Sequence, residues 1–345
     1  MRPLRFLVPG TTGRFRCGGL LVELQTARML SALGPVEVVT YRQREDGRPF
    51  LADLLREESL PCGAGSALWI VSWGFDVPWL LRQLQGRACA YHAHSSGYGF
   101  SLPAGVPVLA VSRNTLGYWG DRAPRNPLWL VPNALSPEWL ERGQRGGAGE
   151  RSIDVLVQLR KNSAYVLKQL VPALQARGLR VEVQSGWVDD LVDLFNSAKV
   201  VLYDSADYWR GRGVSEGFGL PPLEALACGC VVFSSFNHAL ADTLDPGRIG
   251  HQLGSGTLAA DLDAISAAAR DPAAWRPDQA ALTAFLASAS EAELLTRWRQ
   301  ALAAINQHWD RMFAREPALK APPRWWLQLK TKLRPIGSLA GRLRP

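Results

Sequence analysis

Short apolar runs alternate with longer amphipathic segments along most of the chain. The first two runs, 4–8 and 36–41, enclose a segment whose apolar residues recur at helical spacing between Leu20 and Leu30. A strand, a helix and a second strand in this order are typical of a parallel sheet. Further strands are expected at 67–72, 88–91, 106–111 and 128–132, whereas the polar residues 42–65 show no clear pattern. The first part of the chain is therefore predicted to be an α/β domain.

A charged, glycine-rich stretch at 141–152 separates this pattern from a second, similar one. Strands are expected at 153–159, 180–184, 200–203, 231–233 and 251–253, and helices at 165–177, 189–197, 223–228, 239–244, 257–270 and 278–287. A long amphipathic helix is expected at 291–313. The alternation of strands and helices predicts a second parallel sheet, and the length of the chain suits two domains.

The most informative stretch is 214–235, with the sequence VSEGFGLPPLEALACGCVVFSS. Prolines open its helical run and a glycine follows it, so it reads as a loop, a helix and a strand. Backbone N–H groups near Gly219 and Leu220 would lack intrahelical partners and could hold a phosphate or diphosphate. Glu216 on the loop and Glu224 in the first helical turn would flank this anion site. Carboxylates accept hydrogen bonds from hydroxyls, so a nucleotide sugar fits this arrangement.

The string EGFGLPPLEALACG resembles the paired-glutamate E-x7-E motif of the GT4-like (group 1) GT-B glycosyltransferases. In that family the first glutamate, here Glu216, contacts the donor sugar, and the second, here Glu224, holds the ribose. The backbone after Glu216, at Phe218, Gly219 and Leu220, holds the diphosphate. An ordinary amphipathic helix, in which Glu224 merely favours the helix dipole, is the alternative interpretation.

The resemblance also implies an architecture. Two Rossmann-like domains would face each other across a cleft, with an acceptor-binding domain at 1–134 and a nucleotide-sugar-binding domain at 135–290. A final helix, 291–316, would cross back to the N-terminal domain, and a basic aromatic tail, 317–345, would follow.

Three further places resemble parts of the family's site. Gly18-Gly19, in the loop 10–19, fits a glycine pair near the donor phosphates, although both glycines could serve only a tight turn. His94 fits a histidine that assists near the donor sugar by hydrogen bonding, and whether it or His92 faces the site is left open. The family's Gly-Arg and Lys-Gly elements are replaced by adjacent Arg160-Lys161 without the glycine. These two residues are expected to neutralise the diphosphate, unless they are merely solvated.

The implied reaction is transfer of a hexosyl unit from a nucleotide diphosphate sugar to an acceptor hydroxyl, with retention. Glu216, His94, Arg160 and Lys161 would carry it. We expect no metal and no cofactor beyond the nucleotide sugar, since no Asp-x-Asp motif stands at a suitable strand end. A non-catalytic GT-B scaffold, a sugar-nucleotide epimerase and a phosphorylase are the alternatives. The sugar, the base and the acceptor, whether a glycan or a lipid-linked molecule, are left open.

The composition of the chain indicates the class of protein and its expected location. The chain is 47% hydrophobic and 20% charged, as in soluble globular proteins. It has no apolar run long enough to span a bilayer and too short an N-terminal apolar segment for a signal peptide. Its five cysteines are odd in number and lie mostly in apolar contexts, so reduced thiols and a cytoplasmic location are expected.

The net charge of +8 is concentrated at the C-terminus, because 320–345 holds seven basic residues and no acidic one. The rest of the chain is nearly neutral, so nucleic acid is not an expected partner of the whole protein. Trp325, Trp326 and several leucines alternate with the basic residues. This composition suits an anionic membrane surface and a peripheral position at the inner membrane face. A flexible tail, a packing arm and a single-strand nucleic-acid binder are the alternatives.

Overall fold

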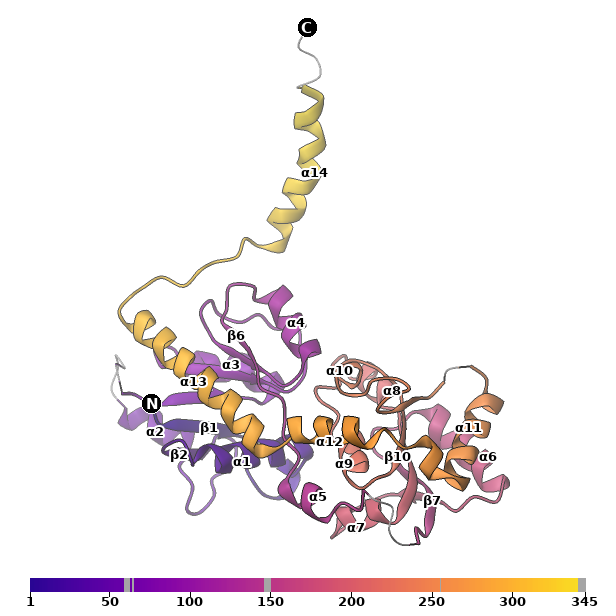
Figure 1. Ribbon diagram of the computed structural model, residues 1–345. Coiled ribbons are helices and arrows are strands. Elements are labelled where there is room, and N and C mark those ends of the chain that lie inside the picture. Colours follow the sequence, from indigo (N-terminus) through magenta and orange to yellow (C-terminus); the bar gives the residue numbers. More distant parts are fainter. Residues whose placement is uncertain (59–62, 64, 146–149, 255, 341–345) are drawn as a thin grey trace.

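The computed structural model describes residues 1–345 except 59–62, 64, 146–149, 255 and 341–345, and it contains two parallel sheets (Figure 1). The first has the strand order β2-β1-β3-β4-β5-β6, and all its pairs are parallel. Its strands are β1 (Leu4–Val8), β2 (Val36–Thr40), β3 (Leu68–Val71), β4 (Cys89–Ala93), β5 (Val108–Ala110) and β6 (Leu128–Leu130). The predicted first α/β domain is therefore confirmed.

Helices connect these strands, and the first of them lies where the hydrophobic pattern predicted one. The main ones are α1 (Gly18–Leu30), α3 (Val77–Gln83) and α4 (Arg113–Arg122), and the short turns η1 (Gly13–Phe15) and η2 (Gly74–Asp76) precede two of them. The prediction missed α2 (Leu51–Glu57) in the polar segment. This helix forms because Leu51, Leu54 and Leu55 share one face and pack against the core of the first domain.

The second sheet has the order β11-β10-β9-β7-β8. Its strands are β7 (Ile153–Gln158), β8 (Val181–Gln184), β9 (Ala198–Tyr203), β10 (Val231–Ser234) and β11 (His251–Gln252). Two separate apolar clusters cover its two faces. The helices around it are η3 (Val166–Leu170), α6 (Val171–Ala176), α7 (Leu191–Asn196), α8 (Ala206–Arg210), α9 (Leu220–Ala227), α10 (Leu240–Thr243), α11 (Leu258–Arg270), η4 (Pro272–Trp275) and α12 (Gln279–Ser288).

The segment between the two sheets contains a short helix, α5 (Pro137–Arg142), which ends where the charged, glycine-rich stretch 141–152 begins. The long helix α13 (Glu291–Phe313) then returns to the first domain (Figure 1). Its apolar stripe, which includes Trp298, Leu302 and Ile305, is buried in the core of the first sheet. Trp309 donates a hydrogen bond from Nε1 to the Cys89 carbonyl at 3.0 Å. The predicted crossing of the last body helix is thus confirmed.

The C-terminal segment forms a further helix, α14 (Arg324–Ala340), which stands clear of the two domains (Figure 1). Its described side chains are exposed, including Trp325 at 64% and Leu329 at 50%. Among the described residues, no helix combines the length and apolar character needed to cross a membrane.

Candidate functional site

The carboxyl ends of the two sheets meet through a pair of loops. The loop after β4 contributes Ser95 and Ser96, and the loop that leads from α8 to α9 contributes Ser215. Ser95 Oγ donates to the Ser215 carbonyl at 2.6 Å, and the Ser96 N–H donates to Ser215 Oγ at 3.0 Å. The Ser215 N–H in turn donates to the Ser96 carbonyl at 3.1 Å. All three serines are buried, so the contact is shielded from water.

Glycines allow the two loops to approach this closely. A Cβ built on Gly217 would lie 1.4 Å from the carbonyl oxygen of His94, and one built on Gly97 would lie 2.4 Å from that of Gly213. Gly97 also has a φ of +95°, which residues with side chains rarely adopt. Backbone therefore packs on backbone between the domains, right beside Glu216.

Glu216 lies at this junction with only 4% of its surface exposed. Its Oε2 accepts hydrogen bonds from the Tyr203 hydroxyl at 2.6 Å and from Trp209 Nε1 at 2.7 Å. Burial, and then the negative charge of Glu216, raise the pKa of Tyr203 well above its ordinary value, so this hydroxyl stays a donor. The carboxylate is thus fixed by two donors, and Oε1 is the oxygen directed elsewhere.

Lys161 and Arg160 occupy different environments. Lys161 Nζ lies 3.9 Å from Glu216 Oε1 and 4.9 Å from the centre of the Trp209 ring. The backbone of Lys161 has a φ of +64°, an uncommon conformation for this residue type. Arg160 is exposed. The structure therefore brings Lys161, and not Arg160, to Glu216.

Helix α9 begins at Leu220, with Gly219 as its N-cap residue at a φ of +84°. Pro221 and Pro222 lack a backbone N–H, so the N–H groups of Gly219 and Leu220 are the donors left for an anion at this end. The placement of Glu224 in the first turn was wrong, because the helix starts earlier than expected and Glu224 lies in the next turn. Phe218 is buried and packs into the apolar cluster on this side of the second sheet.

The environment of Glu224 favours a proton on its carboxyl group. Burial raises the pKa of Glu224 to about 7, and the charge of Lys161 opposes this rise. Near neutral pH this carboxyl group can therefore either donate or accept a hydrogen bond.

On the other side of the junction, Gly18 and Gly19 form the first turn of α1 rather than part of the loop before it. The expected loop 10–19 therefore ends at Cys17. Both glycines are exposed, and a Cβ at either position would meet no atom within 4 Å. Neither has a positive φ. Neither packing nor a tight turn therefore requires glycine at 18 or 19.

The two histidines differ in burial, as Lys161 and Arg160 do. Strand β4 extends to Ala93 rather than ending at Tyr91, so His92 lies within the strand and is buried. His94 follows the strand, and 19% of its side chain is exposed. The structure thus places His94, and not His92, toward the open side of the junction.

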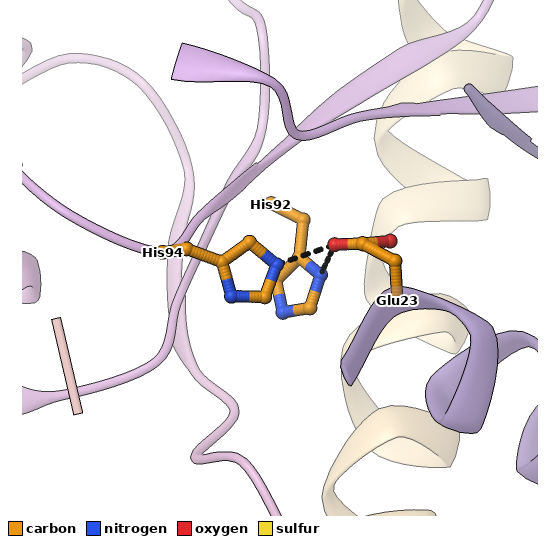
Figure 2. A group of neighbouring side chains, drawn as sticks. All are labelled: Glu23, His92 and His94. Carbon is orange, nitrogen blue, oxygen red and sulfur yellow. Dashed lines mark hydrogen bonds and ion pairs between the residues drawn. The ribbon is translucent and has the colours of Figure 1, made fainter. Parts of the chain in front are cut away.

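Glu23 on α1, which the sequence prediction missed, lies beside the two histidines, on the same side of both rings (Figure 2). One of its oxygens, Oε1, is 2.6 Å from His92 Nδ1 and also contacts His94 Nε2. Burial acts to raise the pKa of Glu23, but the contacts with both histidines outweigh burial and lower this pKa to about 2. The carboxylate is therefore ionised. A signal was present in the sequence, because Glu23 stands among the apolar positions of the helix, between Leu20 and Ala27.

Comparison with known proteins agrees with this architecture. Residues 166–272 match the family model described as Glycosyl transferases group 1. No curated protein matches the chain in sequence. The family model covers much of the second sheet and all of 214–235, so the expected likeness to the group 1 glycosyltransferases is confirmed for this domain.

Solved structures extend the likeness to most of the chain. Sucrose-phosphate synthase from Thermosynechococcus elongatus aligns with a TM-score of 0.63 and 16% identity, covering 88% of this chain and 100% of that one. A glycosyltransferase from Rickettsia africae aligns with a TM-score of 0.58 and 11% identity, covering 89% and 98%. Anabaena HepE in complex with UDP-glucose aligns with a TM-score of 0.51 and 17% identity, covering 92% and 100%. The two-domain GT-B fold is thus shown for the chain.

Proposed function

We propose that this chain, whose residues 166–272 match the group 1 glycosyltransferases, transfers a glycosyl unit from a nucleotide diphosphate sugar to an acceptor hydroxyl. The observation that carries the proposal is the setting of Glu216. This buried carboxylate is fixed by Tyr203 and Trp209, lies beside Lys161, and precedes the start of α9 by a few residues. A carboxylate that can accept hydrogen bonds from sugar hydroxyls therefore lies where the two domains meet. Two sources of positive potential, Lys161 and the start of α9, lie beside it.

In this proposal the diphosphate binds at the start of α9. The N–H groups of Gly219 and Leu220 and the positive end of the helix dipole would hold its oxygens. Lys161 would add a full charge from the side of Glu216, and exposed Arg160 would reach the phosphates from outside. These groups stabilise the departing diphosphate electrostatically, so the reaction needs no metal to neutralise it.

The two glutamates would hold the hydroxyl groups on either side of the diphosphate. Glu216 would accept hydrogen bonds from the donor sugar through Oε1, because its other oxygen is already occupied. Glu224 would contact the ribose, and its pKa of about 7 lets it serve as a donor or an acceptor there. Neither glutamate is assigned a covalent role, in keeping with a retaining reaction without a glycosyl-enzyme intermediate.

A donor panel tests this proposal. The full chain is incubated with UDP-, GDP- and ADP-sugars, UDP-glucose first because Anabaena HepE has been solved with it. Both thermal stability and release of the nucleoside diphosphate are followed. We expect one nucleotide class to raise the melting temperature by mass action and its sugar to be hydrolysed or transferred. If no nucleotide stabilises the protein and none is released, even with glycan and lipid-linked acceptors present, the enzyme proposal fails and a GT-B scaffold is favoured.

We also propose that α14 attaches the protein to an anionic membrane surface. Its described part exposes Trp325, Leu327 and Leu329, and it carries Lys330 and Lys332 without any acidic residue. Aromatic rings at the headgroup level and basic groups against lipid phosphates would then act together.

Flotation with vesicles tests this attachment. The full chain should float with vesicles that contain phosphatidylglycerol and should not float with purely zwitterionic ones. A chain ending at residue 319 should stay at the bottom of the gradient in both cases. Equal flotation of the two chains would overturn the proposal, and a full-length Leu319→Ser chain, which loses an exposed leucine outside α14, should still float with the anionic vesicles.

A further inference from the structure

Beside the site, the described part of the chain holds a cluster of titratable side chains formed by Glu23, His92 and His94 (Figure 2). Glu23 comes from α1, and the two histidines come from β4 and the loop after it. The ring centres of the histidines are 4.2 Å apart, and both rings approach the same oxygen of Glu23. The cluster lies on the first domain at the loop that contacts Ser215 and Gly217.

We infer that Glu23 is a positioning residue, which holds His94 with its Nε2–H inward and presents the Nδ1 lone pair to a substrate hydroxyl. The inference rests on the proposed glycosyl transfer, which it deepens. His92 has a supporting role, because it holds Glu23 Oε1 from the side of the core.

The proton positions follow from the chemistry of the three groups. Glu23 is ionised, so its Oε1 can only accept, and the two ring nitrogens that contact it must each carry a proton. Burial lowers the pKa of His92 despite the neighbouring carboxylate, so His92 is neutral with its proton on Nδ1. Its Nε2 is buried without a hydrogen-bond partner among the described residues, as expected for a nitrogen without a proton in an apolar setting. His92 thus serves only to orient Glu23.

The same reasoning fixes His94. Its Nε2 carries the proton that contacts Glu23, so in the neutral ring Nδ1 has the lone pair. Figure 2 shows that this second nitrogen points away from Glu23. The backbone of His94 contacts Gly217, next to Glu216, so the ring stands at the junction of the two domains. A hydroxyl of the donor sugar or of the acceptor is the group that would donate to it.

The spacing of the donor atoms argues against a metal ion in this cluster. The three ligand atoms lie within 4.8 Å of one another, which is close enough for a site. However, His92 Nδ1 and Glu23 Oε1 are separated by 2.6 Å, a hydrogen-bonding distance. Ligands that surround zinc tetrahedrally at about 2.0–2.1 Å stand roughly 3.3 Å apart. The arrangement is therefore that of a hydrogen-bonded cluster.

Ring NMR of ¹⁵N-histidine-labelled full chain tests the inference without any substrate. In the wild type, His94 should be in the Nε2–H form and His92 in the Nδ1–H form. Glu23→Gln removes the charge and keeps the size, and we expect His94 to lose its single tautomer while the protein stays folded. Glu57→Gln, on the exposed face of α2, is the matched control and should leave both rings unchanged. A wild-type His94 with its proton on Nδ1 would overturn the inference.

Kinetics with the donor found in the panel supply the second readout. Glu23→Gln should lower kcat by about 10- to 100-fold with little change in KM, since a misplaced hydrogen-bonding group slows the chemical step. Wild-type kinetics in Glu23→Gln would overturn the positioning role while leaving the proposed function intact. Stoichiometric zinc binding by the wild type, lost in Glu23→Gln, would replace the inference with a metal site. If the wild type uses no donor, the proposed function fails, and the NMR result still decides the tautomer.

Discussion

The two halves of the proposed site hold a buried carboxylate in the same way, but they would offer different groups to a substrate. Glu216 Oε2 and Glu23 Oε1 each have two partners, Tyr203 and Trp209 in one case and His92 and His94 in the other. The second oxygen of Glu216 lies toward Lys161, whereas that of Glu23 is buried and has no partner among the residues that the structure describes. Glu216 can therefore meet a ligand directly, but Glu23 can act only through His94.

Replacement of Glu216 by glutamine should have the largest effect of the changes considered. Glutamine keeps the size but loses the charge. If its amide NH₂ group faces Tyr203 or Trp209, one hydrogen-bond donor meets another and that hydrogen bond is lost. We expect kcat/KM for the donor to fall by about 10²- to 10³-fold, the usual loss for a preorganised electrostatic group. Glu182→Gln, on exposed β8, is the control and should match the wild type. Wild-type activity in Glu216→Gln would show that Glu216 does not contact the donor during the reaction.

Gly217→Ala tests whether the two halves must touch. The added Cβ would overlap the carbonyl of His94, so the loops must separate and His94 must move away from Glu216. A displacement of this order should lower kcat by about 100-fold. Gly117→Ala, on the exposed face of α4 with no atom near its added Cβ, should remain active. Unchanged kinetics in Gly217→Ala would show that catalysis occurs with the halves apart.

The charge state of Glu224 predicts a pH dependence of stability. Its folded pKa of about 7 exceeds the unfolded value near 4.5, so the folded chain binds the extra proton between these values. This contribution is present at low pH and is lost as the pH rises through about 7. Over that interval the free energy of unfolding should fall by an amount on the order of 2 kcal/mol, and Glu224→Gln should abolish this decrease.

Urea titrations from pH 4.5 to 8 measure this effect. The control is the same series for Glu182→Gln, which should retain the wild-type slope because Glu182 is exposed. A Glu224→Gln protein with the wild-type slope would mean that Glu224 is ionised in the folded state.

The basic pair offers the smallest and most selective comparison. Lys161→Met removes the charge near Glu216 and should weaken donor binding by about tenfold, seen in KM and in the thermal shift with nucleotide. Arg160→Met removes an exposed charge, and screening by solvent should make its effect smaller. Loss of affinity in Arg160→Met alone would reverse the assignment made from the geometry.

Much of the fold could be predicted because its signal is local. Apolar runs mark β1 and β7, and helical spacing marks α1 and α13, so the alternating order already implied two parallel sheets. The predictions failed at α2, a short helix in a polar segment. In α2 a few leucines on one face pack onto a core that is built from distant strands.

The half of the proposed site on the C-terminal domain could be predicted for the same reason. Glu216, Gly219 and Glu224 lie close together in the sequence, and the glycines and prolines between them announce a loop and a helix start. The sequence by itself therefore determined the two-sheet pattern and the helix start between Glu216 and Glu224, where we propose that an anion binds.

Only the tertiary structure decided which side chains act together. It selected Lys161 over Arg160 and His94 over His92, because the end of a strand and one unusual φ angle set the direction of each side chain. It also brought Glu23 into contact with His92 and His94, which lie 69 and 71 positions further along the chain. A helix and a strand packed in one core create that proximity, and local periodicity carries no information about which residues of the two will meet.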